Sequence, residues 1–116
     1  MISVVIPSLG GDLCDTLDSI NAGSICPDEI IVCLPNDTHS VKDELKYKSL
    51  EVVYAEQYGQ VYQRIVGFKH AKGDYVLQLD DDIFIDSGCL EQLIASLQEL
   101  PTSSTVSPCL FNTNDR

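Results

Sequence analysis

The sequence predicts an α/β fold: a Rossmann-like, mainly parallel sheet with flanking helices. Short apolar runs rich in β-branched residues alternate along the chain with segments whose apolar residues recur at helical spacing. The runs are continuously apolar rather than alternating, which is typical of strands covered on both faces. With 116 residues, 44% of them hydrophobic, the chain is long enough for one domain with a substantial core.

The chain opens with a strand, a loop and a helix. Residues 1–7 are dominated by β-branched side chains, and Pro7 ends the strand because proline offers no N–H. Residues 8–11 form a loop with two glycines. Asp12 is a suitable N-cap for the following helix. That helix carries Leu13, Leu17 and Ile20 at helical spacing and stops at Asn21-Ala22-Gly23.

Two more strands and a second long helix occupy the middle of the chain. The strands are Glu29–Leu34 and Leu50–Tyr54, and residues 40–45 between them carry a weak helix signal. Gly59 opens the helix, and Lys72-Gly73 ends it with a cation and a C-cap glycine. Its predicted buried stripe consists of Val61, Ile65, Phe68 and Ala71.

A fourth strand, Tyr75–Leu79, ends in the carboxylates Asp80, Asp81 and Asp82. Ligands of parallel α/β sheets collect at the carboxyl ends of the strands. Neighbouring acids repel each other, and a divalent cation such as Mn²⁺ or Mg²⁺ removes that cost while sharing phosphate oxygens with a substrate. The triplet is therefore either a metal site that holds a nucleotide diphosphate or a solvated turn whose aspartates cap the next helix.

The last helix is capped by Asp86 or Ser87 and terminated by Pro101. Its apolar residues at helical spacing are Leu90, Leu93, Ile94 and Leu97. A further strand is predicted over 105–110. We expect residues 1–110 to form the domain and residues 111–116 to be a polar tail or a truncation point.

Composition narrows the class of partners and the compartment. Eighteen acidic residues against seven basic ones give a formal charge of −11, which disfavours nucleic acid and anionic membranes. A polyphosphate ligand would therefore need local screening by a cation. The five cysteines form no C-x-x-C pair, and no apolar stretch is long enough for a transmembrane segment, so we expect a cytoplasmic protein.

Four segments in a fixed order carry a resemblance to a known family. They are Ser3-Val4-Val5-Ile6-Pro7-Ser8, Pro27-Asp28-Glu29-Ile30-Ile31-Val32, the set Gly59, Arg64, Gly67, Ala71, Gly73, Asp74 and Tyr75, and Leu79-Asp80-Asp81-Asp82. On these residues the chain resembles the N-terminal, nucleotide-binding half of glycosyltransferase family 2, which has the GT-A fold. The resemblance implies metal-dependent transfer of a sugar, with inversion, from a nucleotide-diphosphate donor to an acceptor hydroxyl.

The resemblance also implies roles for individual residues. Asp82 and Asp80 would be the ligands of Mn²⁺ or Mg²⁺. Asp80 would also face the nucleotide sugar, and the neighbouring Asp81 would belong to the same nucleotide-sugar site. Pro7 and Ser8 would meet the nucleoside through backbone groups. Arg64 would lie near the diphosphate, where a guanidinium binds oxygens in a fork; the alternative is an ordinary surface charge.

The chain departs from the family pattern after the second strand. The family usually has an Asp-Asp-Gly-Ser type sequence there, whereas Asp37 is the one acid near this position, and it either contacts the nucleotide base or belongs to a turn. Ile65 stands where an asparagine commonly follows the arginine. The acceptor-binding half and the catalytic base are expected outside this chain, so the catalytic residue and the acceptor stay unassigned.

Two other function classes remain open from the sequence. One is a different metal-dependent nucleotide or phosphotransfer enzyme. The other is a non-catalytic, truncated glycosyltransferase-like binding module. In either case truncation would leave an apolar face or a sheet edge uncovered, so self-association is an expected property.

Overall fold

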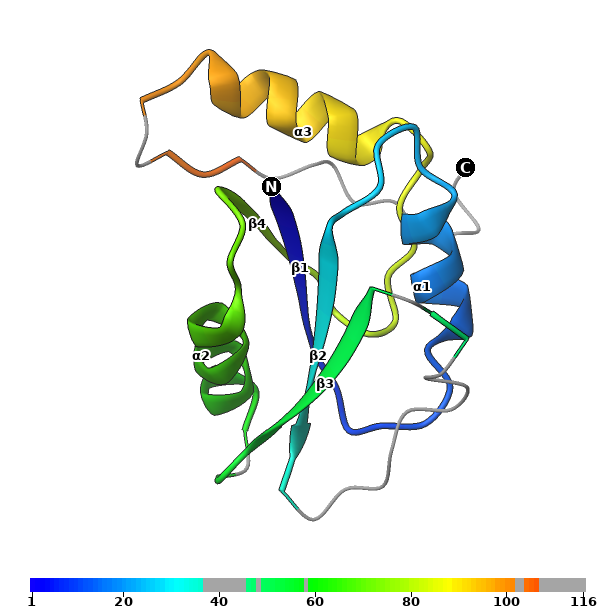
Figure 1. Ribbon diagram of the computed structural model, residues 1–116, viewed down its shortest axis with the longest axis vertical. Coiled ribbons are helices and arrows are strands. Elements are labelled where there is room, and N and C mark those ends of the chain that lie inside the picture. Colours follow the sequence, from blue (N-terminus) through cyan, green and yellow to red (C-terminus); the bar gives the residue numbers. More distant parts are fainter. Residues whose placement is uncertain (37–45, 48, 58, 102–103, 107–116) are drawn as a thin grey trace.

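The computed structural model describes residues 1–36, 46–47, 49–57, 59–101 and 104–106. Within them, four parallel strands form one sheet in the spatial order β3-β2-β1-β4 (Figure 1). The strands are β1 (Ile2–Pro7), β2 (Glu29–Pro35), β3 (Leu50–Ala55) and β4 (Tyr75–Gln78). The predicted Rossmann-like parallel sheet is confirmed. Because β1 pairs with both β2 and β4, the carboxyl ends of these three strands meet at one edge.

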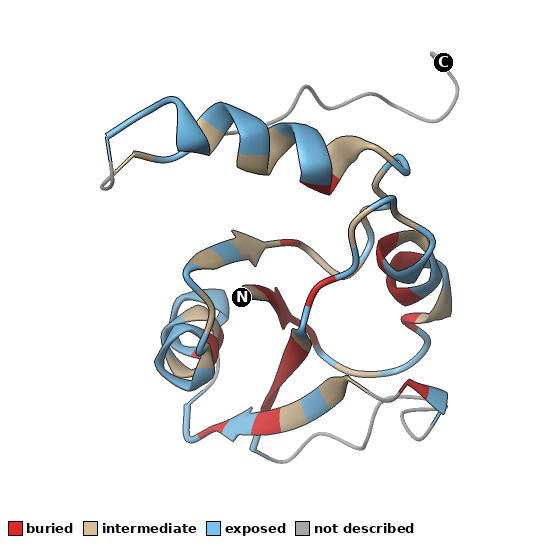
Figure 2. Cartoon of the chain, turned by 45° about the horizontal axis from the view of Figure 1, so that its top comes forward, coloured by how far each residue is buried: buried red, intermediate tan, exposed pale blue. Residues whose placement is uncertain are grey.

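Helices cover both faces of the sheet. The helix α1 (Cys14–Asn21) lies on one face and α2 (Gln60–His70) on the other, as the two views in Figures 1 and 2 show. The helix α3 (Cys89–Gln98) lies across the end at which the strands begin. Its Leu90 is buried, whereas Leu93, Ile94 and Leu97 are half-buried. No helix among the described residues has both the length and the apolar character needed to cross a bilayer.

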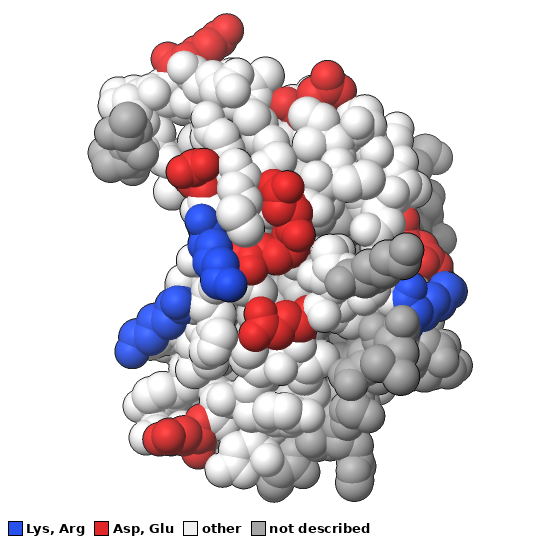
Figure 3. Space-filling model, in the orientation of Figure 1, with Lys and Arg blue, Asp and Glu red and all other residues white. Residues whose placement is uncertain are grey.

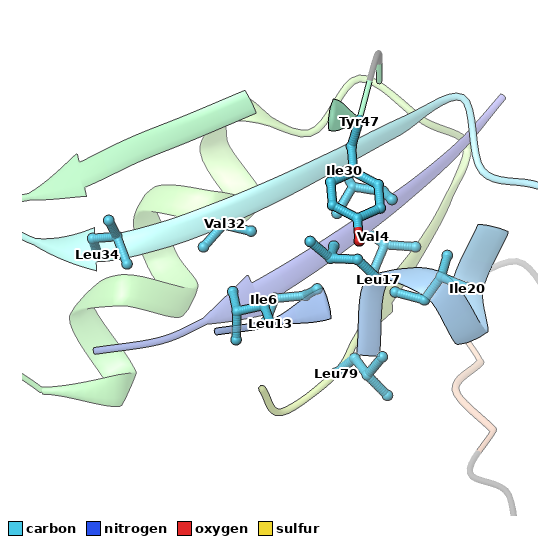
Figure 4. Close-up of a cluster of buried hydrophobic side chains, with 10 residues drawn as sticks. All are labelled: Val4, Ile6, Leu13, Leu17, Ile20, Ile30, Val32, Leu34, Tyr47 and Leu79. Carbon is cyan, nitrogen blue, oxygen red and sulfur yellow. The ribbon is translucent and has the colours of Figure 1, made fainter. Parts of the chain in front are cut away.

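Alternation along the strands divides the core into two clusters. On the α1 face, strand residues such as Val4 and Ile6 pack against the apolar side of α1. The ten residues in Figure 4 are Val4, Ile6, Leu13, Leu17, Ile20, Ile30, Val32, Leu34, Tyr47 and Leu79. On the α2 face the cluster is smaller and consists of Val5, Ile31, Cys33 and Val53, with Val66 and Ala71 packed against it.

The predicted buried stripe of α2 is wrong for three of its four residues. Val61 is 65% exposed, Ile65 43% and Phe68 47%. The residues of α2 that are buried are Gln63 and Gly67. Apolar spacing predicted the wrong face of α2. The face that is buried carries Gln63 and Gly67, because it meets backbone carbonyls of the sheet that need a donor and because the helix axis comes close to the strands there.

This orientation of α2 predicts opposite responses to charge on its two faces. Phe68→Glu is expected to change the free energy of unfolding by no more than about 0.5 kcal/mol, because exposed positions tolerate substitution. Val66→Glu is expected to cost about 3 kcal/mol or more, because it places a charge in the α2 cluster. Urea denaturation of both variants is the measurement. A large fall in the free energy of unfolding of Phe68→Glu would show that the predicted stripe is buried after all.

The predicted helix ends are also corrected in part. Asp12 Oδ1 accepts a hydrogen bond from Cys14 N–H at 3.0 Å, although α1 itself begins one residue later than an Asp12 cap would place it. At α3 neither Asp86 nor Ser87 is the N-cap: Gly88 holds that position, without a side-chain cap. The Cys89 N–H instead bonds the Asp86 backbone oxygen at 3.0 Å.

Gly73 is not a helix C-cap. The helix α2 ends at His70, its C-cap is Ala71 in extended conformation, and Gly73 lacks the positive φ of a C-cap glycine. An added Cβ at Gly73 would lie 2.7 Å from Ser3 N and 2.9 Å from the Met1 carbonyl oxygen. Glycine is needed here because the α2–β4 turn runs directly against the backbone of β1.

A carboxylate ties this turn to the beginning of the sheet. Glu29 Oε2 accepts hydrogen bonds from Ser3 Oγ and, at 2.6 Å, from Lys72 N–H, while Gly73 N–H donates to Ser3 Oγ at 2.8 Å. Burial raises the pKa of Glu29, but the hydrogen bonds from Ser3 and Lys72 outweigh burial and leave that pKa below its ordinary value of 4.5.

The lowered pKa predicts a loss of stability in acid. A carboxyl group with a depressed folded-state pKa stabilises the fold above its unfolded-state pKa, and this stabilisation disappears as the pH falls through the folded-state pKa. Glu29→Gln should therefore destabilise the protein at pH 7, by about 1 to 2 kcal/mol, and flatten the loss between pH 5 and about pH 3. Urea denaturation across this range is the measurement. Glu51→Gln, at an exposed position of β3, is the control. If the free energy of unfolding changes with pH by the same slope in both variants, the prediction is contradicted.

Some predicted elements lie outside the described residues. The short helix over 40–45 and residues 107–110 of the last predicted strand belong to these parts. Residues 104–106 are described and are not in a strand. Strand β4 ends at Gln78 rather than Leu79, but the Leu79 N–H still bonds the Val5 carbonyl oxygen at 3.0 Å, so the ladder with β1 continues into the acidic segment.

Candidate functional site

The acidic segment after β4 is fastened to the loop that follows β1. Ser8 Oγ donates a hydrogen bond to Asp81 Oδ2 at 2.8 Å and accepts one from Gly10 N–H at 3.0 Å. From α1, Thr16 Oγ1 donates to the Asp81 backbone oxygen at 3.0 Å. Residues 73 positions apart in the chain therefore meet at the carboxyl edge of the sheet. Asp81 faces into the protein, and its oxygens are partly used there.

Arg64 lies next to Asp80 at the carboxyl edge of the sheet. Its Nη2 atom is 3.6 Å from Asp80 Oδ1 and 3.3 Å from Gln60 Oε1. The Arg64 Nε is buried without a hydrogen-bond partner among the described residues, while the side chain as a whole is 33% exposed. Gln78 Nε2 also donates to Asp80 Oδ1 at 3.3 Å. The guanidinium keeps donors for a further anionic oxygen, as a phosphate would supply.

Asp82 is exposed and forms no hydrogen bond or ion pair with the residues that the structure describes. No residue of the described ranges therefore occupies its carboxylate. Acidic side chains dominate the charged surface in Figure 3, so an incoming polyphosphate meets mostly negative charge.

The donor set can be compared with what a divalent cation requires. Among the described residues, no three His, Cys, Asp or Glu side chains converge on a point where they could hold a metal ion. Mg²⁺, however, is commonly bound by one or two carboxylates together with substrate phosphates and water. Asp80 and Asp82 match that smaller requirement, since both are at least partly exposed and supply hard oxygen ligands.

The remaining predicted contacts lie in the β1 loop and after β2. Pro7 and Ser8 are buried. Ser8 N–H donates to the Cys33 carbonyl oxygen at 3.0 Å, and the Ser8 carbonyl accepts from Gln63 at 2.7 Å, so these backbone groups already have partners inside the protein. Contact of Pro7 and Ser8 with a nucleoside stays a prediction. Asp37 lies outside the described residues.

Two residues of the site escaped the sequence analysis. Thr16 and Gln63 are polar residues on helices, a pattern that usually marks a solvated face, yet they are 1% and 2% exposed. Their burial follows from partners supplied by other elements, which no spacing along the chain reveals. Cys33 is fully buried, and burial raises the pKa of its thiol to about 12, which leaves it without nucleophilic thiolate at neutral pH.

A model of the family described as glycosyl transferase family 2 matches residues 3–115. The chain belongs to glycosyltransferase family 2. The fold agrees, since the chain superposes on S. aureus TarS 1–349 in complex with UDP with a TM-score of 0.68 and 25% identity over 84% of this chain. TarS 1–349 in complex with UDP-GlcNAc gives a TM-score of 0.63 at 23% identity. The parallel sheet and its flanking helices thus match the GT-A fold of the TarS structures.

Among curated relatives, the uncharacterized glycosyltransferase YwdF of Bacillus subtilis (strain 168) is 29% identical over 89 residues, which are 74% of this chain. The chain spans 33% of the length of YwdF and 32% of TarS 1–349. The chain therefore corresponds to about one third of the length of each of these relatives.

Proposed function

We propose that this chain supplies the donor-binding part of an inverting, metal-dependent glycosyltransferase. The observation that carries the proposal is the carboxyl-edge arrangement: Ser8 fixes Asp81, Arg64 stands beside Asp80, and Asp82 stays exposed. The proposal is supported by the family and by TarS structures that hold UDP and UDP-GlcNAc. A nucleoside diphosphate sugar is accordingly the ligand we assign to this edge.

Each side chain then has a distinct task. Asp80 and Asp82 would hold Mn²⁺ or Mg²⁺, which when bound neutralises charge on the leaving diphosphate. Arg64 binds phosphate oxygens with the donors that Gln60 and Asp80 leave unused. Asp81 orients the acidic segment rather than binding the cation, because one of its oxygens accepts the Ser8 hydrogen bond.

The acceptor hydroxyl needs a base, since a neutral hydroxyl is a poor nucleophile. No described residue is assigned this role, and we expect the base to lie in the part of family 2 enzymes that this chain does not match. Binding of donor without transfer of sugar is therefore the expected behaviour of the 116 residues. Robust sugar transfer by the chain alone would overturn this division of labour.

Calorimetric titration with UDP, GDP and CDP, each with and without Mn²⁺, tests the proposal. We expect heat of binding for at least one nucleotide, and only when the cation is present. Binding that is independent of the cation would refute the metal role. A complete absence of binding to all three nucleotides would instead favour the non-catalytic module.

A further inference from the structure

Gln63 makes two short polar contacts in the interior that the proposed function does not use. This side chain is 2% exposed, and its Nε2 atom donates to the Ser8 carbonyl oxygen at 2.7 Å and to the Cys33 carbonyl oxygen at 2.7 Å. A side-chain amide has two N–H donors, and both are used here on backbone carbonyls. The two acceptors belong to different parts of the sheet: Ser8 directly follows β1, and Cys33 lies two residues before the end of β2.

The contacts of Gln63 lead directly to the acidic segment. The Ser8 carbonyl accepts a hydrogen bond from Gln63, and the Ser8 hydroxyl donates one to Asp81 Oδ2. The Ser8 N–H shares the Cys33 carbonyl oxygen with Gln63, at 3.0 Å. Gln63 therefore links α2 to the residue after β1 and to β2. It is connected to Asp81 by hydrogen bonds through one intermediate residue, Ser8.

The position of α2 is adapted to this contact. One turn after Gln63 stands Gly67, where an added Cβ would lie 2.4 Å from Val5 Cγ1 and 2.6 Å from Cys33 Sγ. The absence of a side chain lets the helix approach β1 and β2 closely. Arg64 follows Gln63 immediately in the chain. The hydrogen bonds of Gln63 therefore also fix the position of the helix from which Arg64 contacts Asp80.

We propose that Gln63 is a positioning residue of the donor site: it sets Ser8, and through Ser8 the carboxylate of Asp81, relative to Arg64. The structural part stands on the contacts above, and its consequence for ligand affinity rests on the proposed function. Loss of both donors deprives the buried Ser8 carbonyl of its Gln63 partner, leaves the Cys33 carbonyl with the Ser8 N–H, and releases Ser8 from α2. The acidic segment then loses its fixed relation to the guanidinium.

The test replaces Gln63 by methionine, which has similar length and no donors, in the full 116-residue chain. In the ligand-free protein, the NMR amide signals of Gly10 and Asp81 are expected to shift, although neither residue touches Gln63 directly. With Mn²⁺ present, the affinity for UDP is expected to fall about tenfold. The combined loss in Gln63→Met with Ser8→Ala should be smaller than the product of the single losses, since both act on one contact.

Val66→Ala is the matched control. Val66 also lies on the buried side of α2 but packs by apolar contact alone. It should lower thermal stability while leaving the Asp81 amide signal and the UDP affinity unchanged. If Gln63→Met fails to fold, Gln63→Glu is the second variant: burial favours its protonated form, which keeps one donor, so the Asp81 signal should approach the wild-type position as the pH falls.

The outcomes separate the two proposals. Unchanged Gly10 and Asp81 signals in the Gln63 variant, or losses of affinity that multiply independently of Ser8→Ala, overturn the positioning role. Shifted signals in a protein whose wild type binds none of UDP, GDP and CDP support the positioning role and overturn the proposed function. Shifted signals with coupled losses of affinity support both.

Discussion

Gly67→Val is expected to destabilise the fold by about 3 kcal/mol, the upper part of the range for overpacked cores. A Cβ at this position would lie 2.4 Å from Val5 Cγ1 and 2.6 Å from Cys33 Sγ, closer than side-chain atoms approach one another. Neither neighbour can turn aside at low cost, because Val5 is β-branched and both are fully buried. The gain in helix propensity over glycine, below about 1 kcal/mol, does not compensate.

Equilibrium denaturation in urea, followed by circular dichroism, measures this loss. Gly88→Ala is the matched control, because an added Cβ there has only the flexible end of Gln92 near it, at 3.9 Å, and Gly88 does not have positive φ. The control should change stability by no more than about 0.5 kcal/mol. Equal stability of Gly67→Val and the wild type would mean that α2 lies farther from the sheet than described.

The second large effect concerns ligand binding. Asp82→Asn is expected to abolish Mn²⁺-dependent binding of UDP, a loss of at least about tenfold in affinity, or 1.4 kcal/mol. The substitution keeps the size of the side chain and removes its charge, and Asp82 is the carboxylate that the described residues leave unpaired. Stability should not fall, since an exposed group without partners contributes little to it.

Two comparison variants make this result specific. Asp74→Asn removes a charge at the opposite end of the same strand, where Asp74 meets the amino terminus at 3.1 Å, and should leave binding unchanged. Asp81→Asn retains an oxygen that can accept from Ser8 and should have an intermediate effect. If Asp82→Asn binds UDP and Mn²⁺ as the wild type does, the assignment of Asp82 to the cation is wrong. An Asp74→Asn loss as large as that of Asp82→Asn would show a general effect of charge instead.

Local pattern was sufficient for the four strands of the sheet but not for the orientation of α2. Ile30–Leu34 is apolar without interruption, and the structure places β2 between β1 and β3, with helices on both faces of the sheet. These five side chains are all buried, and such a pattern has one interpretation. In α2 the spacing of Val61, Ile65 and Phe68 predicted burial, yet all three are exposed. The buried side is instead selected by carbonyls and close packing from other elements.

The candidate site shows the same division. The acidic triplet and Arg64 were identifiable as chemistry at the end of a strand and on a preceding helix, and the structure brings Arg64 to Asp80. The resemblance to the family set Asp80 and Asp82 apart from Asp81, but the sequence offered no physical reason for distinguishing these adjacent aspartates. That distinction comes from Ser8, which engages Asp81, and from Gln63, which engages Ser8.

The sequence by itself determined the parallel α/β class, the family and the place of the acidic segment, because these follow from apolar runs, their order and the residue types at strand ends. The tertiary structure alone decided which face of α2 is buried, which aspartate is held inward and which polar residues support the loop after β1. The physical reason is that hydrogen bonds and steric contacts between distant elements depend on where those elements lie in space. The spacing of residues along one helix or strand does not specify which side chains or backbone groups of another element pack against it.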